Sequence, residues 1–164
     1  MTTFMCVGLL MMSQVSQGAK AVDHSALVAL VPTVTGWTRG EVSGSRDGMM
    51  GMSFSRAEAE YTKGNVTIRL EILDTALIPM MVMPFSMAAS GSLNEKSAEG
   101  YKRGTTVNGS PGWEEWTNDG KNGDVNVLVA GRFLVHGSGS DLPGFEPIRE
   151  IMAAVPMARV AALK

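Results

Sequence analysis

The chain contains a single cysteine among its 164 residues, at position 6. One thiol cannot form an intramolecular disulfide, so a disulfide framework is excluded. Histidine is also scarce, with two residues, His24 and His136, that lie far apart in the sequence. Neither has a cysteine, histidine or glutamate at metal-ligand spacing beside it. The sequence therefore contains no recognisable metal-binding motif.

Positive charge is not in excess, because 14 Lys and Arg residues stand against 16 Asp and Glu residues, for a formal net charge of −2. Nucleic-acid binding depends on basic surface that neutralises phosphates, so we expect no nucleic-acid partner. Hydrophobic residues make up 45% of the chain and charged residues 18%. This composition is too apolar for a disordered chain, and the length is typical of one globular domain.

An uncharged apolar run, FMCVGLLMM, occupies residues 4–12 and is too short to span a membrane. It has the length of the hydrophobic region of a secretory signal peptide. The motif Ala19-Lys20-Ala21 follows, with small residues where signal peptidase requires them. We therefore expect a signal peptide over residues 1–21, cleavage after Ala21, and a mature domain over residues 22–164.

The segment before the apolar run, Met1-Thr2-Thr3, has no Lys or Arg. Either the initiator amine supplies the positive charge of the signal, or the true start lies upstream. The alternative interpretation of residues 1–18 is a buried N-terminal strand or helix of the domain. Export predicts a periplasmic or secreted protein with no integral membrane segment after cleavage. Cleavage would also remove Cys6, as expected for a domain in an oxidising compartment.

Apolar and polar residues alternate clearly over residues 66–73, where Val66, Ile68, Leu70 and Ile72 share one side. The preceding segment, 54–62, alternates as well, and a Lys-Gly-Asn turn joins the two into a predicted hairpin. The same reasoning predicts further strands over residues 37–42, 101–107, 112–117, 124–130 and 132–136. Residues 43–51, rich in glycine and serine, are expected to form a loop, and residues 92–100 a polar connector.

Three helices are predicted. Asp23 or Ser25 can cap a short first helix that Pro32 ends. The run TALIPMMVMPFSMAAS, residues 75–90, is apolar nearly all round, so it is either buried or faces a membrane or a partner. The last helix spans residues 145–163 and is expected to divide at Pro156. The sequence thus predicts an α+β domain with an antiparallel sheet of about six strands, covered by a central and a C-terminal helix.

The best candidate for a functional surface is the methionine-rich central helix together with the tryptophan-bearing strand. Methionine adapts to irregular apolar ligands, and an exposed apolar patch marks a binding site. Trp113 and Trp116 are three positions apart on one strand and are therefore expected to face opposite sides. The predicted surface for a protein partner or a small apolar ligand comprises Met80, Met81, Met83, Phe85, Met87, Trp113 and Trp116.

A second hypothesis is a copper or other metal site built on thioether ligands, which favour Cu(I). The cluster Met49, Met50 and Met52 would supply them, with His24 or His136 completing the site. No resident cofactor is otherwise expected. Against this hypothesis, methionine is used freely throughout the chain, with 13 residues.

A third hypothesis is a hydrolase whose polar residues converge only in the folded protein. The segment HGSGSD, residues 136–141, joins a strand to a helix, but its glycines do not match the nucleophile elbow of serine hydrolases. Glu58 and Glu60 share a face, as glycosidase acids could. Cross-strand ion pairs with Arg56 and Arg69 are the simpler expectation for them.

The order of elements, with a Gly-Trp pair after a short helix, a hairpin, a crossing helix, a strand meander and a C-terminal helix, resembles the Mog1/PsbP-like layout. It also resembles many exported bacterial proteins. The resemblance covers most of residues 23–164 and lies in element order, so no site residue follows from it. That layout is mostly found in accessory and binding proteins, so the resemblance implies an exported, noncatalytic accessory or binding protein.

Overall fold

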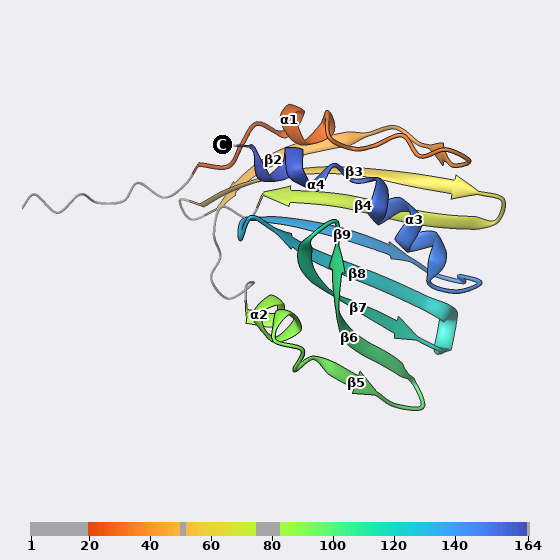
Figure 1. The fold of residues 1–164 in the computed structure, drawn as a ribbon. Helices are drawn as coiled ribbons and strands as arrows, with labels where there is room; N and C mark the ends of the chain where they lie inside the picture. The colour runs from red at the N-terminus through yellow and green to blue at the C-terminus, as the bar shows by residue number, and fades with distance from the viewer. Residues whose placement is uncertain (1–19, 50–51, 75–82, 164) are drawn as a thin grey trace, which may run out of the picture.

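The structure is a computed structural model that describes residues 20–49, 52–74 and 83–163. In this part of the chain, one antiparallel sheet of nine strands forms the centre of the fold (Figure 1). The strand order is β1-β3-β4-β9-β8-β7-β6-β5, and β2 pairs with β3 as well. The strands are β1 Thr38–Arg39, β2 Ser43–Met49, β3 Met52–Lys63, β4 Val66–Asp74, β5 Asn94–Lys96, β6 Gly100–Val107, β7 Ser110–Thr117, β8 Asn122–Val129 and β9 Phe133–Gly139.

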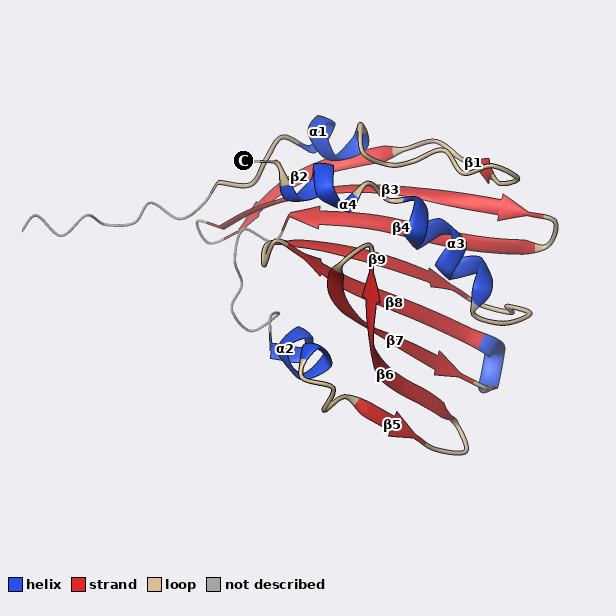
Figure 2. Ribbon diagram, viewed as in Figure 1, coloured by secondary structure: helices blue, strands red, loops and turns tan. Residues whose placement is uncertain are grey.

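The described helices lie on both faces of this sheet (Figure 2). They are α1 His24–Val28, α2 Met83–Ala89, α3 Glu146–Ala154 and α4 Met157–Ala161, with a short 3-10 turn at Asp119–Lys121. α1, α3 and α4 pack on one face and bury the main core against it. α2 packs on β6 and β7 from the opposite side. The predicted central and C-terminal helices thus cover different faces.

The β3–β4 hairpin forms as the alternation predicts. Ile68, Leu70 and Ile72 of β4 are fully buried, and so is Tyr61 of β3. The turn between the strands uses Gly64, whose φ of +61° is the left-handed conformation that glycine adopts without strain. The later turns at 108–109 and 130–131 also have positive φ, which suits the hairpins predicted there.

The strand content is higher than predicted, nine rather than about six, and the prediction of a loop over residues 43–51 is wrong for the described part. Residues 43–49 form β2, which pairs with β3 over its whole length. Its glycines are typical of a loop, but Gly44 lies under α1, where a Cβ would be 2.7 Å from Cγ2 of Val28. The glycine therefore permits close helix packing on a strand.

Two further segments differ from the prediction. The strand expected over residues 37–42 is limited to the two residues of β1. Trp37 is instead buried, and its indole N–H donates to the Glu150 carboxylate over 2.8 Å. The connector expected over residues 92–100 contains the edge strand β5. Short edge strands with polar side chains lack the alternation that reveals buried strands.

The termini of the helices follow the predicted signals. Asp23 caps α1, and its side chain accepts a hydrogen bond from the Ser25 backbone N–H over 2.9 Å. Pro156 separates α3 from α4, as expected. Of the helix predicted over residues 75–90, the structure describes α2, and residues 75–82 lie outside the described residues. No helix in the described part is both long and apolar enough to cross a membrane.

Candidate functional site

The face of the sheet opposite α1, α3 and α4 carries polar side chains on four adjacent strands, β3, β4, β9 and β8. Because β-strand side chains alternate, the partners of the buried core residues all point to this side. We call it the polar face after its polar side chains, which are those of Arg56, Glu58, Glu60, Thr67, Arg69, Glu71, Asn122, Asp124, Asn126, His136 and Ser138. Helix α2 covers the neighbouring strands, β6 and β7.

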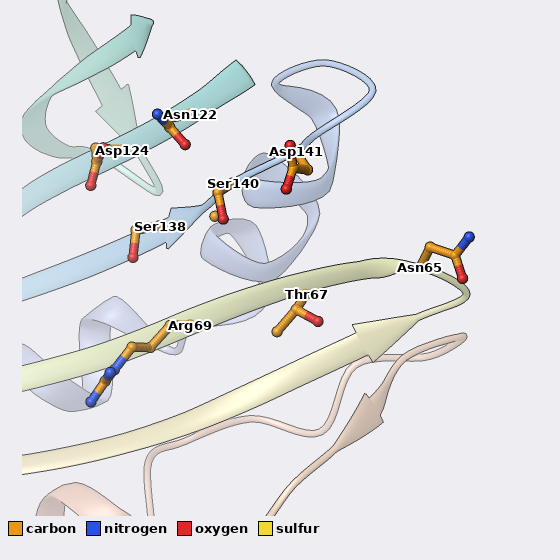
Figure 3. A pocket seen from close by; sticks show the side chains of 9 residues that line it. Asn65, Thr67, Arg69, Asn122, Asp124, Ser138, Ser140 and Asp141 are labelled. Atoms are coloured by element: carbon orange, nitrogen blue, oxygen red, sulfur yellow. The ribbon is translucent and has the colours of Figure 1, made fainter. Parts of the chain in front are cut away.

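One end of the polar face is hollowed into a basin of about 520 Å³ (Figure 3). The lining side chains come from β4 and its preceding turn, from β8, and from β9 with the loop that follows it. All of them except one glycine can form hydrogen bonds, and they include both donors and acceptors. The lining residues are Asn65, Thr67, Arg69, Asn122, Asp124, Ser138, Gly139, Ser140 and Asp141.

Strand register explains why these residues meet. Ser138 of β9 is directly opposite Arg69 of β4 on one side and Asp124 of β8 on the other. The rim is held by backbone hydrogen bonds from the β9–α3 loop to the 3-10 turn, with the Asp141 N–H donating to the Gly120 carbonyl over 2.9 Å. The basin is therefore built on paired strands and a fixed loop.

The charge of Arg69 is already compensated within the polar face. Its Nη2 lies 2.6 Å from Oε2 of Glu58, across the β3–β4 pair. The hydrogen bond from Arg69 lowers the pKa of the Glu58 carboxyl, and the same bond raises the pKa of the guanidinium. A second pair, Arg56 with Glu71 at 3.8 Å, lies beside it. These contacts confirm the predicted cross-strand ion pairs for Glu58, whereas Glu60 forms none among the described residues.

His136 also lies on the polar face and contacts the basin through Asp124. Nε2 of His136 is 3.0 Å from Oδ1 of Asp124 on the adjacent strand. Ser138 is two residues farther along β9, on the same face. No hydrogen bond between His136 and Ser138 occurs among the described residues. A serine nucleophile requires such a bond to its general base, so this dyad does not form a complete catalytic triad.

The apolar surface predicted from the sequence is divided between the two faces. Trp113 of β7 is half-buried on the side of α2, beneath the Lys102 ammonium, which lies 4.1 Å from the ring centroid. Trp116 points to the other face, where its ring contacts that of Phe145. The two tryptophans thus lie on opposite sides, as predicted, and cannot share one ligand.

The central helix provides only part of the predicted methionine surface. Phe85 is buried against the sheet, whereas the Met87 side chain is 45% exposed. Met83 begins α2. Met80 and Met81 lie outside the described residues, so the larger part of that surface stays a prediction.

The residues of the metal hypothesis are distributed over distant parts of the fold. His24 belongs to α1, on the helix-covered face, and His136 points to the polar face, so the sheet separates them. Met49 and Met52 are paired across the β2–β3 hairpin, and Met50 lies outside the described residues. Nowhere in the described ranges do three or more His, Cys, Asp or Glu side chains come together in a way that could hold a metal ion.

Sequence reasoning missed the basin. Its residues are common polar types from positions 65–69, 122–124 and 138–141, and only Thr67, Arg69 and Asp124 lie on predicted strands. The available signal was the alternation, which places Arg69 and Asp124 on the solvent side of their strands, whereas Ser138 lies beyond the predicted end of its strand. The pairing of β4 with β9, which unites them, joins segments about 70 positions apart and leaves no local pattern.

Comparison of this chain with protein families, with curated proteins and with solved structures finds no match to any of them.

Proposed function

We propose that this protein is an exported, noncatalytic binding protein, and that its ligand is a small, uncharged molecule rich in hydroxyl groups, such as a mono- or disaccharide. The observation that carries the proposal is the basin on the polar face. Eight hydrogen-bonding side chains line it, from three strands, the β3–β4 turn and one loop. Ligand sites orient polar molecules by a few fixed donors and acceptors of this kind.

The charges favour a neutral ligand. Arg69, the one cation of the lining, is paired with Glu58, and Asp124 is hydrogen-bonded to His136. A phosphate or sulfate would need free guanidinium or ammonium groups, which the lining does not offer. An apolar ligand is not favoured either, because the lining contains no aromatic or aliphatic side chain larger than threonine.

The proposal retains two expectations from the sequence. Export follows from the apolar run at residues 4–12 and the Ala19-Lys20-Ala21 motif. A Mog1/PsbP-like relationship follows from the order of elements, and the antiparallel sheet with helices on both sides is compatible with it. Accessory and binding roles are the usual ones for that layout, and this supports a noncatalytic function.

Binding can be tested by nuclear magnetic resonance, with glucose, maltose, cellobiose and myo-inositol as probes and inorganic phosphate as the anionic comparison. We expect shifts of backbone amide signals confined to residues 65–69, 122–124 and 138–141 for at least one sugar. Double substitution Asn122→Ala and Ser138→Ala should weaken that binding at least tenfold. Glu115→Gln, on the same side of the sheet but outside the basin, is the matched control and should leave it unchanged.

Two results would contradict the proposal. Shifts produced by phosphate but by none of the sugars would assign the basin to anions. Shifts centred on α2 and Trp113 would instead support the apolar surface predicted from the sequence. A hydrolase would be identified separately, by turnover of an ester or glycoside substrate that the His136→Ala variant loses.

A further inference from the structure

The first described residues of the chain, 20–22, are tied into one end of the sheet. Ala21 and Val22 are both buried, at 3% and 7% exposed. The Val22 backbone N–H donates to Oδ2 of Asp74 over 2.8 Å. The Ser55 hydroxyl donates to the Val22 carbonyl, so both backbone groups of this residue are bound.

The Asp74 side chain is held in position to accept the hydrogen bond from the Val22 nitrogen. Its side chain is fully buried at the end of β4, directly opposite Ser55 of β3. Arg132 binds the carboxylate through two hydrogen bonds, from Nε to Oδ1 over 2.9 Å and from Nη2 to Oδ2 over 2.7 Å. A buried carboxylate forms a stronger hydrogen bond with a charged donor than with a neutral one.

The backbone nitrogen that donates to the Asp74 carboxylate belongs to Val22. Export processing would convert this nitrogen into an α-amine. The motif Ala19-Lys20-Ala21 predicts cleavage of the bond between Ala21 and Val22. In that reaction a water molecule adds across the peptide bond. Ala21 keeps the new carboxylate on the released fragment, and Val22 gains an α-ammonium group.

We propose that Asp74 is the receptor for the α-ammonium group of Val22 in the processed protein, so that signal cleavage creates a buried ion pair that anchors the new N-terminus. The inference rests on the export part of the proposed function and is independent of the ligand in the basin. Because the bond is buried in the folded domain, cleavage precedes folding. The hydrogen bond from a neutral N–H to the carboxylate in the uncleaved chain becomes an ion pair between an ammonium group and the carboxylate.

Cleavage removes three hydrogen bonds formed by residues 20 and 21. All three are more exposed than the hydrogen bond between Val22 and Asp74, which cleavage strengthens. They join the Ala21 N–H to Oγ of Ser53, the Ala21 carbonyl to Arg46, and the Lys20 carbonyl to Arg132, each at 3.1 Å. Arg132 keeps its two bonds to Asp74 after cleavage. The side chains of Ser53 and Arg46 form no other hydrogen bond among the described residues, which makes them useful controls.

The first experiment is export of the full chain in a bacterium, followed by N-terminal sequencing and intact mass of the product. We expect a chain that begins at Val22. A product that begins at Ala21 or earlier, or after Val22, would overturn the inference. A chain that keeps Met1 would also overturn it and would contradict export, whereas sugar binding by that chain would leave the binding proposal intact.

The second experiment measures the α-amine of the processed protein by isotope-labelled reductive methylation and a pH titration. We expect its pKa to lie about one unit or more above the ordinary value for an α-amine, about 8, because the carboxylate stabilises the ammonium. An amine that titrates at the ordinary value would overturn the inference. Asp74→Asn should return the pKa of the Val22 α-amine to its ordinary value. Because this variant can fail to fold, the titration of the unsubstituted protein is sufficient to test the inference.

Stability measurements on Ser53→Ala and Arg46→Gln supply an independent readout. Each side chain forms its one hydrogen bond among the described residues with Ala21, and Arg46 also attracts the exposed Asp23 carboxylate weakly. If the processed chain begins at Val22, Ser53→Ala should leave the unfolding midpoint unchanged and Arg46→Gln should change it only slightly, because the hydrogen-bond partner has left. A clear loss of stability in both variants would place Ala21 in the processed protein and overturn the inference.

Discussion

The Glu114 carboxylate of β7 lies 3.0 Å from the Arg149 guanidinium of α3, measured from Oε1 to Nη2. Glu114 is 2% exposed. Arg103 of β6 supplies a second guanidinium, with Nε 2.7 Å from the same oxygen. One buried negative charge thus connects two strands to the helix on the covered face of the sheet.

We expect Glu114→Ala to lower the free energy of unfolding by about 3 kcal/mol, near the lower end of the range for a broken buried ion pair. The two arginine side chains are about half exposed, which limits the loss because both can turn to solvent. Urea denaturation followed by tryptophan fluorescence measures the change.

Glu115 is the matched control for this substitution. It is the next residue along β7, so its side chain points to the opposite face, where it pairs with Lys102 at 3.2 Å. Exposed pairs contribute less than about 1 kcal/mol, so Glu115→Ala should change stability only slightly. Equal losses in the two variants would show that the buried position of Glu114 has no special importance.

The contact of α2 with the sheet depends on Gly104 of β6. A Cβ at this position would be 2.7 Å from the Ala88 carbonyl oxygen of the helix. We expect Gly104→Ala to displace α2, to cost roughly 1–3 kcal/mol, and to speed hydrogen exchange of the α2 amides. In Gly40→Ala, the control, the new Cβ would lie 3.5 Å from the Glu60 carbonyl, an ordinary contact. Unchanged exchange in Gly104→Ala would contradict this packing.

The parts of the fold predicted from the sequence are those with a strong local pattern. Ile68, Leu70 and Ile72 alternate with polar residues, and burial of one face of β4 follows directly. Pro156 lacks an N–H and ends α3 as its chemistry requires. Where no apolar alternation exists, as in β2 and β5, pairing with a neighbouring strand creates the element, and the local sequence does not reveal it.

The candidate site could not be predicted for a related reason. The alternation places Arg69 and Asp124 each on the solvent side of a strand, yet their proximity to each other and to Ser138 depends on which strands pair. The two tryptophans show the opposite case. Their spacing of three predicts opposite faces, and the ring contacts of Trp116 with Phe145 and of Trp113 with Lys102 agree.

Tyr61 is expected to make the protein sensitive to alkaline pH. Its side chain is fully buried, and its hydroxyl donates to the Pro32 carbonyl over 2.6 Å. Burial raises the pKa of Tyr61 from its ordinary value of 10.0 to about 12. The unfolded chain therefore ionises first, and stability falls as the pH rises from 10 toward 12, by up to about 3 kcal/mol at 1.36 kcal/mol per pKa unit.

Tyr61→Phe should remove this alkaline loss, although it also removes the hydrogen bond to Pro32. Ultraviolet difference absorbance follows the ionisation of the two tyrosines directly. The remaining transition of the variant belongs to Tyr101, whose pKa is also raised, by burial and by the nearby Glu114. If the wild-type protein and the variant lose stability over the same alkaline range by the same amount, the buried Tyr61 hydroxyl is not the cause.

The Arg69–Glu58 pair is expected to govern part of the acid sensitivity and to connect it to the basin. The hydrogen bond from Arg69 lowers the pKa of Glu58 below its ordinary value of 4.5. A lowered pKa in the folded state stabilises the protein above pH 4.5, and that contribution disappears as the pH falls through the lower folded value. Because the pair is partly exposed, the contribution is about 1 kcal/mol or less.

Glu58→Gln should therefore reduce the loss of unfolding free energy between neutral and acid pH, measured by urea denaturation across that range.

The same substitution releases Arg69, a lining residue of the basin, from its compensating charge. We accordingly expect the variant to bind inorganic phosphate at the basin, which the unsubstituted protein should not do. Glu60→Gln removes a carboxylate directly opposite Arg69 that attracts the guanidinium but forms no ion pair with it among the described residues, so it should change both properties less. Identical acid dependence in Glu58→Gln and the wild type would show that the pair contributes nothing to stability, and phosphate binding by both would show that Arg69 is free in the native protein.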